Sequence, residues 1–343
     1  MRVAMYYSNE DVRLEEMPAP EPGRGELLVR VMSSGICGSD VLYWYRAHKV
    51  PLVLGHEIAG EVAAVGEGVE GFRVGQRVSA SHHVPCNTCR YCLRGHHTVC
   101  DTLRRTNFHP GGFAEYVRLP AINVDRGVHL LPEEVSFDEG TFVEPLACVL
   151  RGQRMAGVSL GSSVLVMGSG ISGALHVKLA RALGAATVAA VDINPRRLEA
   201  ARRFGADAAL EASPSVAEEF RKLNGGRGAD AVILTTGAPA AIAAAFEAVD
   251  RGGTVLFFAP TAERDAAVPL PVNALFWRNE VTLTSSYAAN YEEHAAALEL
   301  IRQGKVVVAD MITHRLPLAR AGEGFRLVSE AGESLKVIIR PQE

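Results

Sequence analysis

Four cysteines in one short segment constrain this chain more than any other feature of its 343 residues. They form the pattern Cys-x2-Cys-x2-Cys-x7-Cys, made up of Cys86, Cys89, Cys92 and Cys100. Four thiolates at this spacing can surround one metal ion, and a set without an open position favours zinc. A loop closed by disulfides is the alternative reading of the same spacing. The pattern therefore predicts a structural zinc site within a single loop.

Length and charge set the broad class of the protein. A chain of 343 residues is expected to form two domains rather than one. The net charge of -4 is small, and Lys and Arg are scattered, so nothing indicates a nucleic-acid partner. The first residues do not resemble a secretion signal, and no stretch is apolar for the roughly 18 residues that a membrane span needs. We therefore expect a soluble, cytoplasmic protein without a membrane segment.

The chain has two textures, which indicate an α/β protein of two domains. Up to about residue 145, short alternating apolar runs are broken by glycine and proline, which is typical of a β-rich domain. From residue 161 onward, apolar strands alternate with amphipathic helices, which predicts a doubly wound parallel sheet. The predicted strands cover residues 2–6, 27–34, 58–65, 76–79 and 113–119, and then 163–167, 187–191, 208–210, 231–235, 254–258 and 281–285.

The last part of the chain is predicted to return to the β-rich domain. A helix over residues 291–302 and strands over 311–314 and 335–339 do not extend the doubly wound pattern. The expected division is residues 1–147 with 287–343 for the first domain, and 148–286 for the second.

A glycine motif at residues 168–173 predicts a dinucleotide site in the second domain. It joins the strand at 163–167 to a helix, where glycines let the backbone approach a pyrophosphate and the helix N-terminus stabilises its charge. A glycine turn without a ligand is the alternative. The predicted cofactor-binding residues of the motif are Gly168, Gly170, Ile171, Ser172 and Gly173.

Asp192 bears on which dinucleotide binds. It ends the second strand of this domain, where a carboxylate can accept hydrogen bonds from the adenosine ribose and would repel a 2′-phosphate. NAD is therefore expected rather than NADP. Arg197, one turn into the next helix, is a candidate to cover the adenine, or it is simply solvated.

A second metal site is suggested by Cys37, His56 and Glu57. A thiolate, an imidazole and a carboxylate are three zinc ligand types, and three protein ligands leave a fourth position for water or substrate. A buried cysteine and a core histidine without metal are the alternative. The remaining cysteine, Cys148, is read as a core residue.

These residues carry a resemblance to a known family. The stretch from Gly55-His56-Glu57 through Gly60, Gly66 and Val69 resembles the signature of the zinc-containing medium-chain alcohol dehydrogenases. Cys37, the four-cysteine loop and the glycine motif occur in the order that this family shows. The resemblance covers nearly the whole chain and implies a GroES-like catalytic domain that holds two zinc ions, a Rossmann coenzyme domain, and a small-molecule alcohol as substrate.

Within that family, residues 37–44, 143–146 and 313–318 are similar to sorbitol dehydrogenase and other polyol dehydrogenases. This likeness implies that Cys37 and His56 bind the catalytic zinc, with Glu57 and Glu144 as direct or water-mediated ligands. It also places Tyr43 near the substrate. The implied substrate is a secondary alcohol of a polyol, sugar or cyclitol, and the implied assembly is a dimer or tetramer.

The resemblance implies a mechanism in which zinc stabilises the deprotonated alcohol, Ser39 accepts the proton and a hydride passes to NAD. Leu42 stands where many relatives have a histidine that relays the proton. L-threonine 3-dehydrogenase or an aldose dehydrogenase is the alternative enzyme. A non-enzymatic NAD-binding protein is the alternative of another class, and retention of every zinc ligand argues against it.

Overall fold

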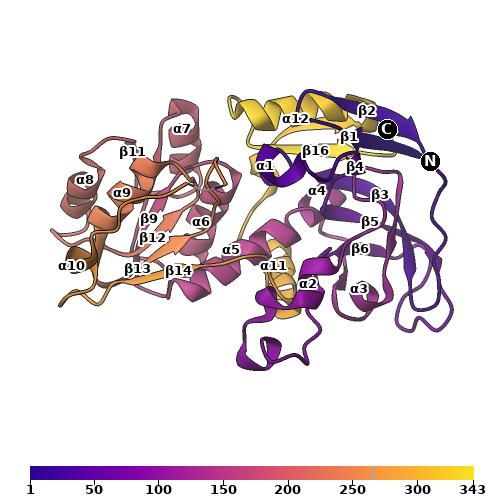
Figure 1. Ribbon diagram of the computed structural model, residues 1–343, viewed down its shortest axis with the longest axis horizontal. Helices are drawn as coiled ribbons and strands as arrows, with labels where there is room; N and C mark the ends of the chain where they lie inside the picture. The colour runs from indigo at the N-terminus through magenta and orange to yellow at the C-terminus, as the bar shows by residue number, and fades with distance from the viewer. Residues whose placement is uncertain (265) are drawn as a thin grey trace. The chain divides into compact units, whose positions relative to one another are not determined.

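The computed structural model describes residues 1–264 and 266–343 and divides into two compact units. The first unit consists of Met1–Ala147 together with Ala288–Glu343, and the second consists of Cys148–Tyr287. Figure 1 labels their helices and strands. Among the described residues, no helix is both long enough and apolar enough to cross a membrane.

The first unit is built on two β-sheets. One has three strands in the order β2-β1-β4, and the other has the order β15-β16-β3-β5-β6-β8 with β7 also paired to β3. Its strands are β1 (Arg2–Tyr6), β2 (Val12–Glu16), β3 (Leu27–Gly35), β4 (Leu52–Val53), β5 (Glu57–Val65), β6 (Arg77–Ala80), β7 (Tyr116–Leu119), β8 (Val128–Leu130), β15 (Ile312–Pro317) and β16 (Lys336–Arg340).

The helices of the first unit are mostly short. They are α1 (Tyr43–Arg46), η1 (Cys92–Arg94), η2 (His97–Val99), α2 (Asp101–Arg105), α3 (Ala121–Arg126), α4 (Phe137–Gly140), α11 (Tyr291–Arg302), η3 (Ala309–Met311), η4 (Leu318–Arg320) and α12 (Ala321–Glu330). Helix α5 (Val143–Met155) contains the boundary at Ala147 and runs into the second unit.

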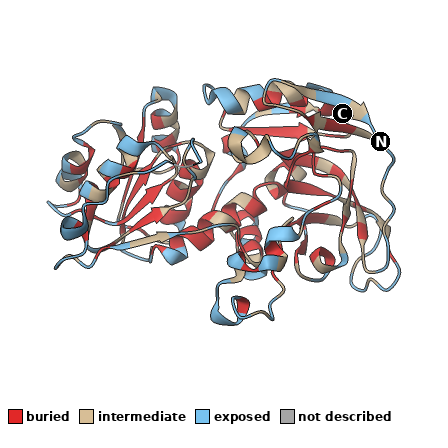
Figure 2. Cartoon of the chain, in the orientation of Figure 1, coloured by how far each residue is buried: buried red, intermediate tan, exposed pale blue. Residues whose placement is uncertain are grey.

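Alternation along β3 explains how the larger sheet forms its core. Leu27, Val29 and Val31 are fully buried, and the residues between them are only partly so. Because successive side chains of a strand point to opposite faces, these three share one face of the sheet. They pack there with apolar residues of the neighbouring strands, including Val62 and Val78. Figure 2 shows the strands of this sheet as largely buried.

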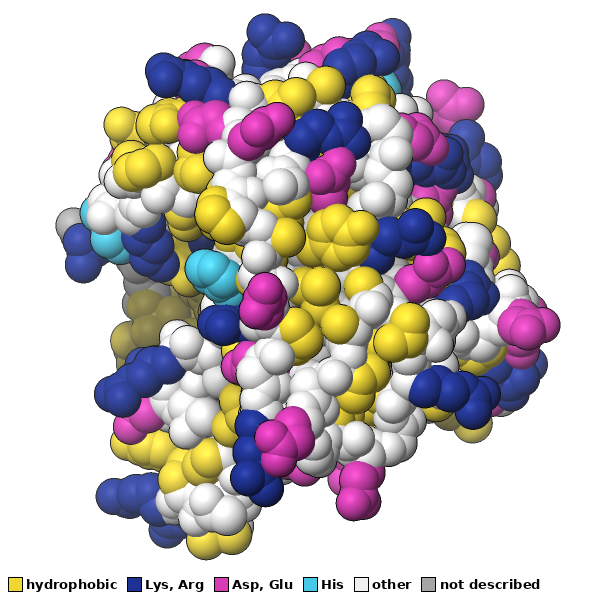
Figure 3. Space-filling model, turned by 90° about the vertical axis from the view of Figure 1, so that its right-hand side faces the viewer, with side chains coloured by type: hydrophobic (Ala, Val, Ile, Leu, Met, Phe, Trp, Pro, Cys, Tyr) yellow, Lys and Arg dark blue, Asp and Glu magenta, His cyan; other side chains and the backbone are white. Residues whose placement is uncertain are grey.

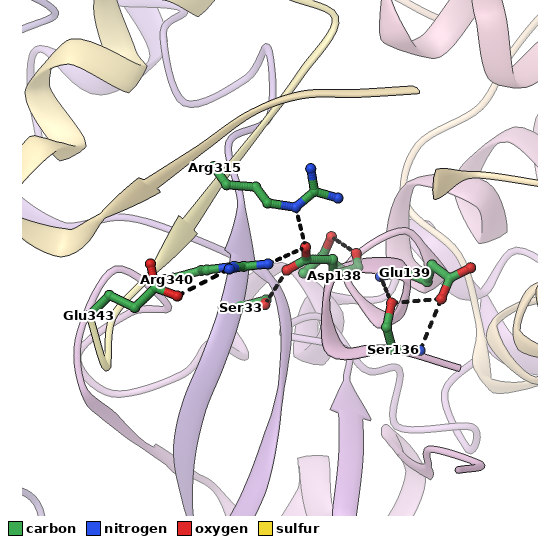
Figure 4. A network of polar contacts seen from close by, with 8 residues as sticks. Ser33, Ser136, Asp138, Glu139, Arg315, Arg340 and Glu343 are labelled. Atoms are coloured by element: carbon green, nitrogen blue, oxygen red, sulfur yellow. Dashed lines mark hydrogen bonds and ion pairs between the residues drawn. The ribbon is translucent and has the colours of Figure 1, made fainter. Parts of the chain in front are cut away.

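The C-terminal strands are tied to the first part of the chain by one buried carboxylate. Asp138 in α4 accepts hydrogen bonds from Ser33 Oγ at 2.7 Å, Arg315 Nε at 2.6 Å and Arg340 Nη2 at 2.9 Å (Figure 4). Burial alone would raise the pKa of Asp138, but Arg340 and the other donors lower it. The carboxylate is therefore held ionised between α4, β3 and the returning strands β15 and β16.

The second unit is a doubly wound sheet. Its six strands lie in the order β11-β10-β9-β12-β13-β14, and every neighbouring pair is parallel. The strands are β9 (Ser163–Met167), β10 (Thr187–Asp192), β11 (Ala208–Glu211), β12 (Ala229–Leu234), β13 (Val249–Phe257) and β14 (Thr282–Ser285). The helices are α6 (Ile171–Ala182), α7 (Pro195–Arg203), α8 (Val216–Leu223), α9 (Pro239–Ala248) and α10 (Val272–Leu275).

Strand order and local signals agree with the predicted α/β fold class, which is confirmed. Helix α7 begins with Pro195 after Asn194, whose side chain accepts a hydrogen bond from the Arg196 N–H, as the N-cap pattern predicts. Sequence patterns missed three short strands, β2, β4 and β8. Strand β2 is largely exposed and β8 has three residues, so neither carries a readable alternation.

Charged side chains are mixed in sign on the face of the molecule that Figure 3 draws. Lys and Arg alternate there with Asp and Glu, and no broad basic area interrupts them. This distribution agrees with the small net charge of -4.

Candidate active site

Cys37, His56 and Glu57 come together at one end of the larger sheet. Each offers one ligand atom, and the three atoms lie within 4.8 Å of one another. Strands β3 and β5 pair antiparallel, with Gly35 opposite Glu57. Because the loop after β3 and the loop before β5 meet at that end, the sheet register alone brings the thiol next to the imidazole and the carboxylate. The predicted ligands are thus adjacent.

Asp40 contacts two members of this group, His56 and Cys37. Its side chain is fully buried, Oδ1 lies 3.4 Å from His56 Nδ1, and Oδ2 accepts the Cys37 N–H at 3.1 Å. Burial would lower the pKa of His56, but the Asp40 carboxylate outweighs that effect and raises it well above its usual value. A carboxylate on one ring nitrogen of a metal-ligating histidine fixes its orientation and leaves the other nitrogen for a metal.

Glu57 has a partner that the sequence did not suggest. Its Oε2 forms an ion pair with Lys336 Nζ, and both side chains are almost completely buried. The Lys336 ammonium also lies 5.3 Å from the centre of the Phe142 ring. A Cβ at Gly35 would lie 2.7 Å from Lys336 Nζ and closer still to Glu57 Oε2, so a larger residue there would force the ends of both side chains to shift. The carboxylate is thus shared between the three-residue group and a buried cation.

Glu144, the other predicted carboxylate, comes from a different element of the same unit. It is in the first turn of α5 and is 9% exposed. The group of mutually close ligand atoms found among the described residues comprises Cys37, His56 and Glu57 without it. Ser39 lies next to the group, because its N–H is 3.5 Å from Cys37 Sγ. Tyr43, the first residue of α1, is 64% exposed.

The four cysteines of the loop form the second group of ligand atoms. All four sulfur atoms lie within 4.8 Å of one another, and Cys89–Cys92 and Cys86–Cys100 are each 3.6 Å apart. A tetrahedron with zinc–sulfur bonds of about 2.3 Å has edges of about 3.8 Å, whereas a disulfide is about 2.05 Å long. All four are free cysteines. The spacing fits a zinc cage and not a pair of disulfides.

Backbone N–H groups favour the thiolate form of one cysteine of the cage, Cys86. Those of Thr88 and Cys89 point at Cys86, and together with the Thr88 hydroxyl they lower the pKa of its thiol to about 5. Thiolates are the form that binds zinc. Beyond the cysteines, the loop has little core of its own, since Leu103 and Ala288 are the other apolar residues packed there.

The glycine motif of the second unit has the geometry of a dinucleotide turn. It connects β9 to α6, and Gly168 has a φ of 98°, which favours glycine. A Cβ at Gly173 would fall 2.0 Å from the Gly168 carbonyl oxygen, so the helix can approach the strand this closely only with glycine there. Gly170 precedes Ile171 and Ser172, the first residues of α6.

Asp192 closes this turn from the neighbouring strand. Its carboxylate accepts the Ser169 N–H at 2.7 Å and the Asn194 N–H at 2.8 Å. Arg197 Nη1 lies 4.0 Å from Asp192 Oδ2, and the guanidinium would lie 3.7 Å from a Cβ at Gly170. The structure therefore brings Asp192 and Arg197 to the glycine turn, where a dinucleotide would meet both.

Comparison with known proteins identifies the family to which this chain belongs. Residues 23–132 match the alcohol dehydrogenase GroES-like domain, and residues 173–303 match the zinc-binding dehydrogenase family. Sorbitol dehydrogenase of Ovis aries is 35% identical over 96% of this chain and 93% of its own length. That of Bacillus subtilis is 30% identical over 99% and 97%. The alcohol dehydrogenase of Thermus sp. ATN1 superimposes with a TM-score of 0.87, at 30% identity and 99% coverage of both chains.

The chain therefore belongs to the zinc-dependent medium-chain dehydrogenases. It is accordingly an oxidoreductase that works with zinc and a nicotinamide cofactor. The predicted family and enzyme class are confirmed.

The Glu57–Lys336 pair gives a prediction for stability. Replacing Lys336 by Met leaves a buried carboxylate without its cation, so the free energy of unfolding should fall by about 3–5 kcal/mol. The double variant Glu57→Gln with Lys336→Met removes both charges and should recover more than half of that loss. Urea unfolding of the wild type and the two variants measures this. Equal losses in the single and double variants would contradict the pairing.

Proposed function

We propose that the protein oxidises a secondary alcohol of a polyol, sugar or cyclitol with NAD. The observation that carries this proposal is the convergence of Cys37, His56 and Glu57 within 4.8 Å, a ligand set that leaves room for a substrate oxygen. The similarity to two sorbitol dehydrogenases supports a polyol-like substrate.

Zinc bound by these residues would lower the pKa of the alcohol, and the nicotinamide would accept its hydride. In this proposal Ser39 takes up the alcohol proton, since it lies beside Cys37. Asp40 orients His56 and the Cys37 backbone. Tyr43 contributes to substrate binding from the exposed side of α1, and Glu144 interacts with the metal or its water.

Two zinc ions per chain belong to the same proposal. One is held by the four-cysteine cage and serves the fold, and the other is held by Cys37, His56 and a carboxylate and serves the reaction. Glu57→Gln and Glu144→Gln test which carboxylate is the ligand, because only loss of a direct ligand should greatly weaken the second zinc.

A screen of alcohols tests the proposed reaction. The purified protein with NAD is offered linear polyols, cyclitols, aldoses, threonine, ethanol and 2-propanol, and NADH formation is followed. A site that hydrogen-bonds several hydroxyls should discriminate strongly against simple alcohols, because its polar groups would be left unpaired. If threonine or a simple alcohol has the highest kcat/KM, the polyol assignment is wrong.

Preference for NAD over NADP is predicted to depend on Asp192. In Asp192→Asn the carboxylate charge is lost, so kcat/KM with NAD should fall about 10- to 100-fold, the effect of about 1.5–3 kcal/mol for a hydrogen bond to a charged group. Activity with NADP should rise, because the repulsion of the 2′-phosphate is removed. Steady-state kinetics with both cofactors measures the ratio.

Asp230→Asn is a matched control for this prediction. Asp230 also accepts a backbone N–H, that of Ser163 at 2.7 Å, but at the start of β9 rather than at the glycine turn. Its replacement should leave the NAD to NADP ratio unchanged. A wild-type enzyme that uses NADP as well as NAD would refute the argument from Asp192.

Assembly into a dimer or tetramer is a further part of the proposal. Strand β14 is at the edge of its sheet, and Val272 and Trp277 nearby are 56% and 72% exposed. An unpaired edge strand with apolar neighbours favours pairing with a second copy. Light scattering at micromolar concentration tests this, and a monomer there would end the idea.

A further inference from the structure

Arg46, the last residue of α1, folds back onto two residues beside the candidate metal site. Its Nε donates to the Ser39 carbonyl oxygen at 3.0 Å, and its Nη2 lies 3.4 Å from Ser39 Oγ and 3.2 Å from Asp40 Oδ1. The side chain is only 12% exposed. One planar guanidinium therefore contacts both a hydroxyl and a carboxylate next to Cys37.

Arg46 and His56 together balance the charge of Asp40. Its side chain is fully buried, and its Oδ1 is shared between Arg46 Nη2 at 3.2 Å and His56 Nδ1 at 3.4 Å. A buried carboxylate is costly unless it is paired, and an arginine keeps its positive charge at every relevant pH. Arg46 thus holds in place the group that orients both His56 and the Cys37 backbone.

We propose that Arg46 is a positioning residue for alcohol oxidation, acting through Ser39 and Asp40; this rests on the proposed function. A hydroxyl has one hydrogen to donate and two lone pairs that accept. Arg46 occupies one lone pair of Ser39 Oγ, so the other remains to accept the alcohol proton while the hydroxyl hydrogen passes to solvent water, which the partly exposed Ser39 can reach. Arg46 itself cannot take up that proton, because its guanidinium is already protonated.

Among the contacts described for this loop, those of Arg46 reach both Ser39 and Asp40. Leu42, at the start of α1, has no group that could orient Ser39. Two contacts at once, one to a hydroxyl and one to a carboxylate, need the fixed fork of a guanidinium, which a lysine ammonium does not reproduce. Lysine at position 46 should therefore restore the charge opposite Asp40 but not the orientation of Ser39.

The experiment compares Arg46→Gln and Arg46→Lys with the wild type and with Arg320→Gln. Arg320 is a matched control in the same unit, since this exposed last residue of η4 pairs with Glu323 of α12 at 2.7 Å. With the best alcohol of the screen, Arg46→Gln should lower kcat about 10- to 100-fold, the usual effect of losing an outer partner of a metal ligand. KM for the alcohol and the affinity for NADH should change less than about twofold, and Arg46→Lys should recover only part of kcat.

A second readout does not depend on turnover. Competition with a chelator measures the affinity of the second zinc site, which should fall about 10-fold or more in Arg46→Gln because Asp40 loses its cation. Zinc in the four-cysteine cage should stay bound. Arg320→Gln should match the wild type in both measurements.

Three results would overturn the proposal. The first is an Arg46→Gln variant that loses thermal stability but keeps kcat and zinc affinity, which means a structural role only. The second is a rise in KM with unchanged kcat, which means substrate binding. The third is full recovery by Arg46→Lys. If the wild type oxidises no alcohol in the screen, the proposed function fails. The zinc affinities of the wild type and Arg46→Gln then still decide whether Arg46 positions Asp40.

Discussion

Cys37→Ala should lose activity by about 10³-fold or more while the protein stays folded. Zinc contributes several kcal/mol of charge stabilisation to reactions of this kind, and each 1.36 kcal/mol corresponds to a factor of ten in rate. Cys37 supplies the only thiolate of its ligand group, and its sulfur lies within 4.8 Å of the ligand atoms of His56 and Glu57. Removing it leaves two ligands, too few to hold the ion.

Metal analysis and NADH formation together measure this effect. We expect two zinc ions per chain in the wild type and one in the variant. The affinity of the variant for NADH should be unchanged, because the glycine turn lies in the other unit. Cys148→Ala is the matched control, a cysteine on α5 that should change neither zinc content nor rate. Retention of two zinc ions with normal turnover in Cys37→Ala would show that the catalytic site lies elsewhere.

Local spacing carried most of what the sequence predicts. The cage and the glycine turn are each made from one short segment. The spacing of residues along that segment is therefore enough to predict each site. Cys37 and His56 are farther apart, yet each stands at the end of a strand whose alternation is readable, and the register of β3 on β5 brings them together. The helix at Tyr291–Arg302 is also encoded locally, and its bounds equal the predicted ones.

Partners from distant segments could not be predicted in the same way. Lys336 is 279 positions from Glu57, and it reaches the site because β16 pairs with β3. A lysine within the apolar run at 335–339 normally points to solvent, whereas this one is completely buried. Asp138 shows the same limit, since Arg315 and Arg340 reach it from the far end of the chain.

The buried ion pair between Glu57 and Lys336 bears on how Glu57 could bind a metal. Sequence patterns treat Glu57 and Glu144 as equivalent candidates for the third ligand. The structure distinguishes them, because Glu57 is close to Cys37 and His56 but has one oxygen engaged by Lys336. With one oxygen restrained, the other remains to meet a metal. The lysine would therefore limit how the carboxylate could bind a metal at the proposed zinc site.

Loss of the cage should unfold the loop that contains it. In Cys100→Ser one ligand is replaced by a weak one, and structural zinc sites contribute about 10 to 16 kcal/mol of apparent binding energy in model peptides. The loop has almost no apolar core to compensate for this loss, since its small cluster consists of the cysteines with Leu103 and Ala288. We expect the structural zinc to be lost and the melting temperature to fall.

Limited proteolysis detects unfolding of the loop, and metal analysis detects loss of its zinc. Arg90 and Arg94 are exposed within the loop, so trypsin should cut there in Cys100→Ser but spare the folded wild type. Cys100→His keeps a zinc-binding side chain and should retain the metal and resist cleavage at least in part. The zinc at Cys37 should remain in both variants until the unit unfolds. Two zinc ions and an uncut loop in Cys100→Ser would mean that Cys100 is not needed to hold the metal, although its sulfur lies 3.6 Å from that of Cys86.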